Sequence, residues 1–310
     1  MKNRNGLALL FLLLSAALSA QDTTRHGNYF KLGSSYLSNA VYSGRRDSAT
    51  VPYFYAEIDY VTKLGFYIGS KAAYLAKPGV HQIDNVSVDA GYNFTLGKNL
   101  SGEIYGSHNF YNDSSFAVMS TITASGGGSI SYELPAISLT AGSYLEFSSK
   151  TDISTSLSAS HRFEVSFVSI SPTVEMSAGT QNFYRQYLVE KKIISQIKNS
   201  KKGKGSGSSG SGNSNSGNGN GSGGGSTTVT TTVQTIAQKD ATRFKVLDYE
   251  IKLPITAERG RLEFFFTPVY AIPVHPATIL STSGAVVRFT EILQNSFYAE
   301  MGFIINLGKQ

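Results

Sequence analysis

The stretch Phe297-Tyr298-Ala299-Glu300-Met301-Gly302-Phe303-Ile304-Ile305-Asn306-Leu307 decides the fold, because its two alternating sets of side chains differ in polarity. Every odd position is apolar, whereas Glu300 and Asn306 stand at even positions. A period of two with one apolar and one polar face is the pattern of a β-strand. The odd side chains of this stretch are therefore expected on one face of a sheet and the even ones on the other.

Similar runs of about 10 to 13 residues recur along most of the chain, as a membrane-spanning β-barrel requires. The first six lie at about 29–42, 51–60, 64–75, 83–94, 100–110 and 116–134. The other six lie at about 137–147, 153–163, 167–176, 244–255, 262–272 and 287–307. The pattern predicts an all-β fold, a transmembrane antiparallel up-and-down β-barrel of about 12 strands, with 10 or 14 as alternatives, whose first and last strands pair.

Three consecutive glycines, Gly126-Gly127-Gly128, leave the number of strands open. The alternation of apolar side chains continues through them, so we favour one long strand over 116–134 that projects beyond the membrane. A three-residue hairpin turn at the glycines would preserve the same alternation and enlarge the barrel.

The N-terminus carries an export signal. Met1-Lys2-Asn3-Arg4 is basic, the run from Leu7 to Leu14 is apolar, and small residues lead to Ala20. This order predicts a signal peptide over 1–20, cut near Ala20, and the apolar run is shorter than the roughly 20 residues of a membrane anchor. An uncleaved anchor is the alternative. The mature chain, 21–310, is then a single outer-membrane barrel domain.

The connections between runs alternate in length. Those at 62–63, 96–99, 135–136 and 258–261 are tight, whereas those at 43–50, 76–82 and 273–285 are longer. Outer-membrane barrels keep short turns in the periplasm and longer loops outside, so both termini are expected in the periplasm.

The segment at about 198–228 begins with lysines and continues, from Gly205 to Ser226, with Gly, Ser and Asn alone. Such a segment cannot bury enough apolar surface to offset its chain entropy, which predicts a disordered extracellular loop. A short helix is expected at its base, over 187–197. The basic part of this loop either contacts lipopolysaccharide phosphates or stays solvated; it comprises Lys191, Lys192, Lys198, Lys201, Lys202 and Lys204.

Charged residues fall mainly on the face opposite the apolar side chains, as a bilayer would impose on a barrel. The candidate lumen-lining residues are Lys31, Glu57, Asp59, Lys71, Asp89, Glu103, Glu133, Glu146, Arg162, Glu175, Asp248, Glu250, Lys252 and Glu300. Three exceptions to the parity, Asp84, Lys245 and Glu291, are expected near the outer strand ends, where a charge reaches water.

Carboxylates outnumber basic groups on this inferred lumen, although the whole chain has a formal net charge of +6. A narrow, acid-lined, water-filled passage favours cations. The alternative is that the carboxylates pair with Lys31, Lys71, Arg162, Lys252 and with backbone or Tyr donors, and so close a non-conducting lumen. Passage of small polar or cationic solutes is the leading hypothesis. A structural or surface-interaction barrel, using its basic Gly-rich loop, is the second.

Catalytic and cofactor motifs are not expected in this sequence. The chain has no cysteine and five scattered histidines without metal-ligand spacing, so no metal site, cofactor or enzymatic activity is predicted. The glycine tracts lack the lysine and helix of a phosphate-binding loop, and no nucleic-acid partner is expected.

The signal peptide, the alternating strands and the aromatic-rich closing strand together resemble outer-membrane β-barrel proteins of Gram-negative bacteria. The stretch from Ser38 to Ser48 is similar to the first strand and loop of uncharacterised porin-like families. The resemblance implies integral localisation in the outer membrane, contact with its lipid, and insertion by the barrel-assembly machinery. The chain departs from the usual terminal aromatic, because Gly308-Lys309-Gln310 follow Leu307. Oligomeric state stays open.

Overall fold

The computed structural model describes residues 27–308, with gaps at 48, 189–234, 239–240 and 284. The predicted signal peptide, the glycine-rich loop at 198–228 and its six lysines lie outside the described residues.

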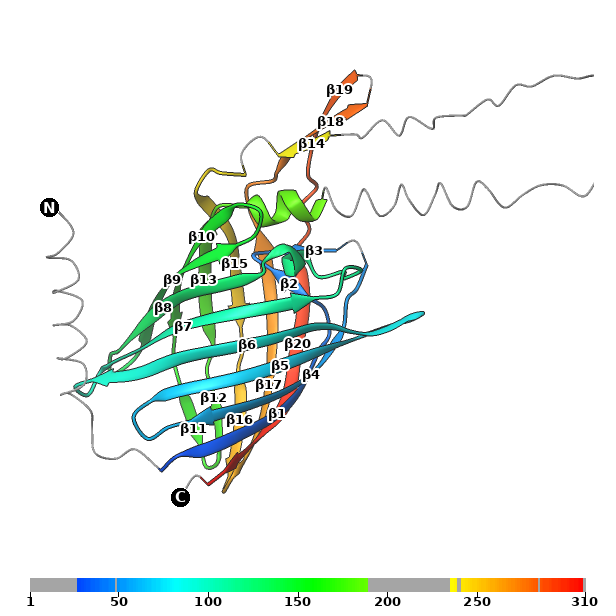
Figure 1. The fold of residues 1–310 in the computed structure, drawn as a ribbon. Helices are drawn as coiled ribbons and strands as arrows, with labels where there is room; N and C mark the ends of the chain where they lie inside the picture. Colours follow the sequence, from blue (N-terminus) through cyan, green and yellow to red (C-terminus); the bar gives the residue numbers. More distant parts are fainter. Residues whose placement is uncertain (1–26, 48, 189–234, 239–240, 284, 309–310) are drawn as a thin grey trace, which may run out of the picture.

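Twelve antiparallel strands form a closed β-barrel, which confirms the predicted fold class (Figure 1). In ring order they are β1 (Tyr29–Leu37), β4 (Tyr53–Val61), β5 (Phe66–Lys77), β6 (Val80–Leu96), β7 (Leu100–Tyr111), β8 (Ala124–Glu133), β9 (Ser138–Phe147), β10 (Thr151–Ser160) continued by β11 (Phe163–Val165), β12 (Val168–Ile170) continued by β13 (Thr173–Gly179), β15 (Lys245–Lys252) continued by β16 (Ile255–Arg259), β17 (Leu262–Pro273) and β20 (Ser296–Leu307).

The first and last strands close the ring, as predicted. β1 pairs antiparallel with β20, from Phe30 opposite Leu307 to Leu37 opposite Glu300. β20 also pairs with β17 on its other side, so the closing strand has no free edge along this register. A closed ring leaves no unpaired row of backbone groups, which is what a sheet inside a bilayer must achieve.

Two of the breaks within strands coincide with prolines. Pro172 separates β12 from β13, and Pro254 separates β15 from β16. Proline has no N–H to give to a neighbouring strand, so the ladder is interrupted there without ending the strand's course around the barrel.

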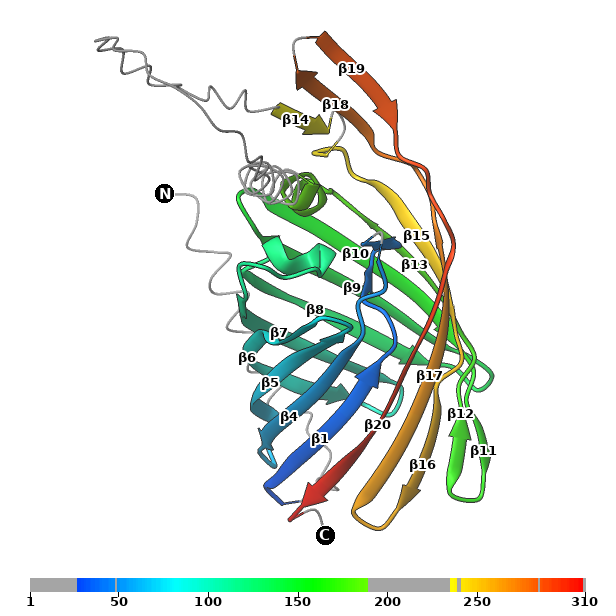
Figure 2. The same cartoon turned by 90° about the vertical axis from the view of Figure 1, so that its right-hand side faces the viewer.

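The two ends of the barrel differ. β1 begins and β20 ends at the end that carries the short turns, including 62–65, 97–99 and 134–137 (Figure 1). The other end carries the longer segments: β2 (Val41–Tyr42), β3 (Arg45–Arg46), the 3-10 helix η1 (Val118–Thr121), a helix over 182–188, β14 (Thr235–Gln238), β18 (Thr278–Ser283) and β19 (Ala285–Thr290). In Figure 2, the blue hairpin of β2 and β3 and the green helical turns lie at this end of the barrel.

Several predicted boundaries were wrong at this second end. The run 29–42 divides into β1 and β2, and 287–307 divides into β19 and β20. The run 116–134 is not one projecting strand, because β8 begins only at Ala124 and η1 precedes it. The three glycines do lie within β8, as favoured, and a Cβ on Gly127 would come 2.3 Å from the carbonyl oxygen of Ser143. The described helix turns over 182–188, earlier than expected.

The outer face of the barrel is apolar. Phe54, Ile68, Ile104 and Phe297 are 50%, 56%, 57% and 69% exposed, and they belong to the apolar parity of their strands. Water-exposed apolar surface this extensive is rare on soluble monomers, whereas the hydrocarbon of a bilayer accommodates it.

Among the described residues, no helix is both long enough and apolar enough to cross a membrane.

Candidate solute pathway in the barrel lumen

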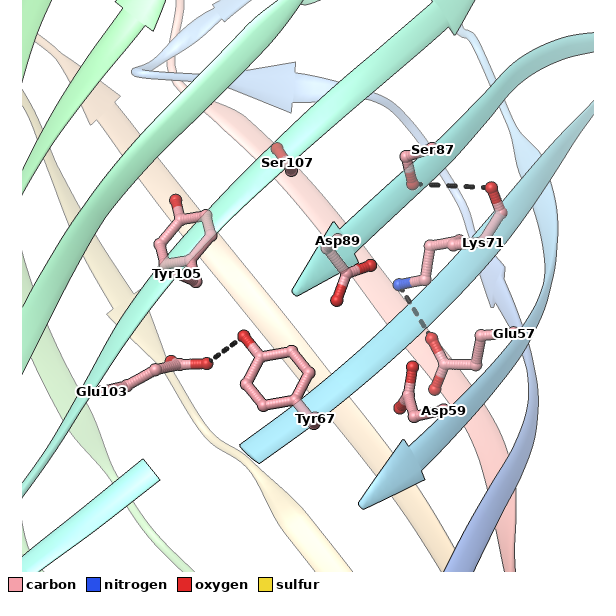
Figure 3. Close-up of a pocket in the computed structure, with 9 residues that line it drawn as sticks. All are labelled: Glu57, Asp59, Tyr67, Lys71, Ser87, Asp89, Glu103, Tyr105 and Ser107. Carbon is pink, nitrogen blue, oxygen red and sulfur yellow. Dashed lines mark hydrogen bonds and ion pairs between the residues drawn. The ribbon is translucent and has the colours of Figure 1, made fainter. Parts of the chain in front are cut away.

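The middle of the lumen holds an acidic cavity of about 390 Å³ against the wall formed by β4, β5, β6 and β7. Figure 3 shows the side chains that line it: Glu57, Asp59, Tyr67, Lys71, Ser87, Asp89, Glu103, Tyr105 and Ser107. They come from the parity opposite the apolar outer face, so the alternation of each strand places them inward. Four carboxylates share this cavity with a single lysine.

The ammonium group of Lys71 contacts both a carboxylate and an aromatic ring in this cavity. Its Nζ lies 3.0 Å from Oε2 of Glu57 and 5.0 Å from the centre of the Tyr55 ring. Both side chains of the ion pair keep contact with water, since 41% of Lys71 and 24% of Glu57 are exposed. A carboxylate and the face of an aromatic ring are both attractive to an ammonium group.

A glycine makes room for two of the carboxylates. Gly69 pairs with Asp59 on one side and with Asp89 on the other. A Cβ at this position would lie 2.2 Å from Oδ1 of Asp59 and 3.1 Å from Oδ2 of Asp89. The absence of a side chain at Gly69 therefore lets both carboxylates lean over the same point of the wall.

The opposite wall carries a second ammonium between carboxylates. Nζ of Lys252 lies 3.1 Å from Oε1 of Glu175 and 2.9 Å from Oε2 of Glu250. The hydroxyl of Tyr298 donates to Glu250 at 2.9 Å. Both sides of the lumen thus place carboxylates around an alkylammonium group.

Other predicted lining residues lie elsewhere along the barrel. Glu300 accepts a hydrogen bond from Ser35 at 2.8 Å, and Lys31 stands opposite Asp59 in the β1–β4 register. Glu133 is exposed near the short-turn end. Arg162 is 61% exposed and pairs with Glu164 at 2.9 Å, so it lies at a rim rather than in the central cavity.

Glu146 and Asp248 point inward but lie beneath the loops at the other end. Glu146 is 5% exposed and accepts hydrogen bonds from Tyr42 and, at 2.9 Å, from Ser154. Asp248 is fully buried, and a Cβ on Gly44 of the β2–β3 turn would come 2.9 Å from its Cβ. These two carboxylates contact loops, not open lumen.

The expectation that Asp84 and Glu291 reach water was wrong. The β5–β6 register shifts between Ala73 and Tyr74, and this bulge turns Asp84 inward, where it is 1% exposed. Glu291 precedes β20 and is 12% exposed, with its Oε2 3.4 Å from Nε of the fully buried Arg45. Lys245 is placed nearer to expectation, because its Nζ is exposed and lies 3.4 Å from the His275 carbonyl.

The loops at this end pack into a cap, defined as the β2–β3 hairpin (Val41–Arg46), η1 and the helix over 182–188. Phe183 and Val118 are 1% and 2% exposed in one apolar cluster, and Tyr42 packs against it. Burial, followed by the charge of Glu146, raises the pKa of Tyr42 well above its usual range, which keeps its hydroxyl a proton donor.

Sequence reasoning allowed for tyrosine donors in the lumen but named none of the tyrosines that lie there. Tyr55, Tyr67 and Tyr105 stand on the same parity as the charged residues, and Tyr67 donates to Glu103 at 2.5 Å. Their parity was a usable signal, because a tyrosine on the polar face needs a partner for its hydroxyl. The cap had no comparable signal, since its contacts join distant loops.

A closed barrel with an apolar outer wall and a charged lumen is the architecture of a membrane-spanning β-barrel. The fold is similar to a solved KdgM porin, with 8% identity over 89% of this chain and 98% of that chain and a TM-score of 0.45. It is also similar to a NanC porin (8% identity, 90% and 100% covered, TM-score 0.45) and to the β domain of the Bordetella autotransporter BrkA (9%, 91% and 100%, 0.38). No protein-family model matches the sequence, and no curated protein matches it.

Within the described residues, no group of three or more His, Asp or Glu side chains is arranged to hold a metal ion.

Proposed function

We propose that the protein is an outer-membrane, porin-like barrel that passes small polar and cationic solutes through its lumen without catalysing a reaction. The observation that carries this proposal is the central cavity, in which four carboxylates and one lysine line about 390 Å³. The apolar outer face and the closed hydrogen-bonded ring support residence in a bilayer.

The preference for cations follows from the fixed charges. Two unit charges 4 Å apart interact by about 4 kcal/mol at an effective dielectric constant near 20, the value suited to a partly solvated protein site. Lys71 neutralises part of the wall, and the excess of carboxylates attracts a passing cation. Tyr55 adds an aromatic face that an organic ammonium can contact, as Lys71 does.

Planar-bilayer recordings test the proposal. In a salt gradient, the reversal potential of the wild-type protein is expected to show cation selectivity. The combined variant Glu57→Gln, Asp59→Asn, Asp89→Asn and Glu103→Gln should lose most of it. Glu133→Gln, at the short-turn end, is the matched control and should leave selectivity within experimental error. Selectivity unchanged by the fourfold variant would sink the proposed role of the acidic wall.

A non-conducting structural or surface-interaction barrel is the second candidate, and the cap favours it, because apolar loops fill one end of the lumen. We also propose that the barrel-assembly machinery inserts the chain and that the basic loop lysines contact lipopolysaccharide.

The orientation of the barrel is a separate proposal, in which the capped end faces outward. A cysteine introduced at the exposed Asp113, which lies at the capped end, should then react with an impermeant thiol reagent on intact cells. Reaction only after outer-membrane disruption would reverse the assigned orientation.

A further inference from the structure

The loops that fill the capped end leave the ring at three evenly spaced places. The first, 38–52, joins β1 to β4; the second, 112–123, joins β7 to β8; the third follows β13 and contains the helix over 182–188. Four strands of the ring separate each loop from the next. Loops that leave a ring at thirds of its circumference must cross its opening to touch one another.

Each pair of these loops is in contact. The rings of Tyr42 and Phe183, from the first and third loops, have centres 5.2 Å apart. The hydroxyl of Thr121, in the second loop, donates to the carbonyl of Phe183 at 3.1 Å. Val51 and Ala117, in the first and second loops, belong to one buried cluster. The three loops therefore meet over the opening.

Two of the three loops are tied to the wall near the strands they leave. In the second loop, Ser115 donates to Asp84 of β6 at 2.6 Å. In the third, the backbone N–H groups of Asn182 and Phe183 both donate to Asp152 of β10, at 2.8 Å each. Asp152 thus satisfies two free donors at the start of the helix. Hydrogen bonds to Asp84 and Asp152 thus hold the second and third loops against the barrel wall close to their own strands.

The first loop is tied differently, because its hairpin reaches across the ring. Tyr42 donates to Glu146 of β9, and β5, β6, β7 and β8 lie between β9 and the loop's own strand β4. The two residues of its turn, Ser43 and Gly44, have φ values of 47° and 69°, as a tight two-residue hairpin turn requires. The hairpin is thus one compact unit held at the far wall.

The other strand of the hairpin is held on the near side. The guanidinium of Arg45 donates to the carbonyls of Leu247, Val274 and His275 at 3.2 to 3.4 Å and pairs with Glu291. These groups belong to β15 and to the segments that follow β17 and precede β20, and only β17 and β20 lie between β15 and the loop's own strand β1. Arg45 therefore anchors the hairpin, whereas Tyr42 holds it across the opening.

We propose that the β2–β3 hairpin is a strap that closes this end of the lumen, with the Tyr42–Glu146 hydrogen bond as its latch and Arg45 as its anchor. This inference rests on the proposed solute pathway beneath it. Release of the latch frees Tyr42 from the far wall, while Arg45 and the hydrogen bond of 2.6 Å from the Tyr187 hydroxyl to Asp47 still hold the base of the hairpin. Glu146 then acts as a holding residue for the strap and not as part of the conducting surface.

Thiol labelling measures strap release without requiring conduction. The chain has no cysteine, so Val118→Cys gives a single probe in the cluster on which Tyr42 packs. Loss of a hydrogen bond to a charged group shifts an opening equilibrium by about a factor of ten. Tyr42→Phe should therefore speed labelling of this probe about ten-fold. Tyr53→Phe is the matched control, because Tyr53 also donates to a buried carboxylate, Asp84, but within one side of the ring. It should change the rate less than about two-fold.

Circular dichroism of each variant confirms that the barrel is folded before rates are compared. Equal labelling rates with Tyr42 and with Phe at position 42 would overturn the strap. Single-channel recordings then separate this inference from the porin proposal. An open probability that rises about ten-fold with Tyr42→Phe supports both. Faster labelling with no conductance in any variant supports the strap and defeats the porin proposal, whereas equal open probabilities in conducting channels defeat the strap alone.

Discussion

Glu57 and Lys71, in the middle of the lumen, have side chains that are 24% and 41% exposed, whereas Asp152 and Glu146, at the capped end, are buried residues, 0% and 5% exposed. All four stand on the inward parity of their strands. In the middle, the carboxylates meet one another and a lysine around a cavity. At the capped end, they accept hydrogen bonds from loops. An inward-facing carboxylate in this barrel therefore either lines the solute pathway or holds a loop in place. The presence of a loop above the carboxylate decides which of the two roles it has.

The apolar centre of the cap should be most sensitive to lost volume. Phe183→Ala removes a side chain that is 1% exposed, and such truncations cost about 3 to 5 kcal/mol. We expect the Val118→Cys probe to become labelled far faster in this background. Phe183→Leu keeps most of the volume and should cost less than about 1.5 kcal/mol. Similar labelling in both backgrounds would mean that the cap does not depend on this packing.

Loss of the Asp152 carboxylate should have the second-largest effect on the stability of the cap. Asp152→Ala leaves the N–H groups of Asn182 and Phe183 without their acceptor, at about 1 to 3 kcal/mol for each buried donor. Hydrogen exchange at these two amides should accelerate strongly. Asp152→Asn retains one acceptor oxygen, so its exchange rates should lie between those of wild type and Asp152→Ala. Unchanged protection in the alanine variant would show that another group holds the helix.

The free volume beside Gly69 in the central cavity should affect single-channel conductance more than it affects the stability of the barrel. Gly69→Ala places a methyl group where the carboxylates of Asp59 and Asp89 lie, so single-channel conductance should fall as they are displaced into the cavity. Gly106→Ala is the control, because the nearest atom to its added Cβ is 3.9 Å away. Equal conductance in the two variants would argue against a narrow point at Gly69.

The smallest change in stability is expected for Lys71→Met. An ion pair that is about a third exposed contributes at most about 1 kcal/mol, so urea unfolding followed by circular dichroism should scarcely shift. Cation selectivity should nevertheless increase, because four carboxylates then face the cavity without their lysine. The increase should shrink at 1 M salt, where screening acts within about 3 Å. Stronger anion passage would contradict the acidic-wall mechanism.

Strand alternation was enough to predict the barrel, its closure and the inward parity of Glu57, Asp89 and Glu250, because a period of two is a local property. Alternation gave the wrong direction for Asp84, because a β-bulge shifts its parity by one residue and nothing in the neighbouring sequence marks that shift. Glu146 had the correct parity but an unforeseen partner, because Tyr42 lies 104 residues away. Parity states where a side chain points, whereas exposure depends on what distant loops place above it.

The even spacing of the three cap loops also bears on the order of assembly. Tyr42, Phe183 and Thr121 belong to loops that leave the ring a third of its circumference apart, so we expect their contacts to be complete only after β1 has joined β20. Contacts between such distant segments must await the closure of long stretches of chain. We therefore expect cap formation to be the last folding event, and cap protection to report that a barrel has finished closing.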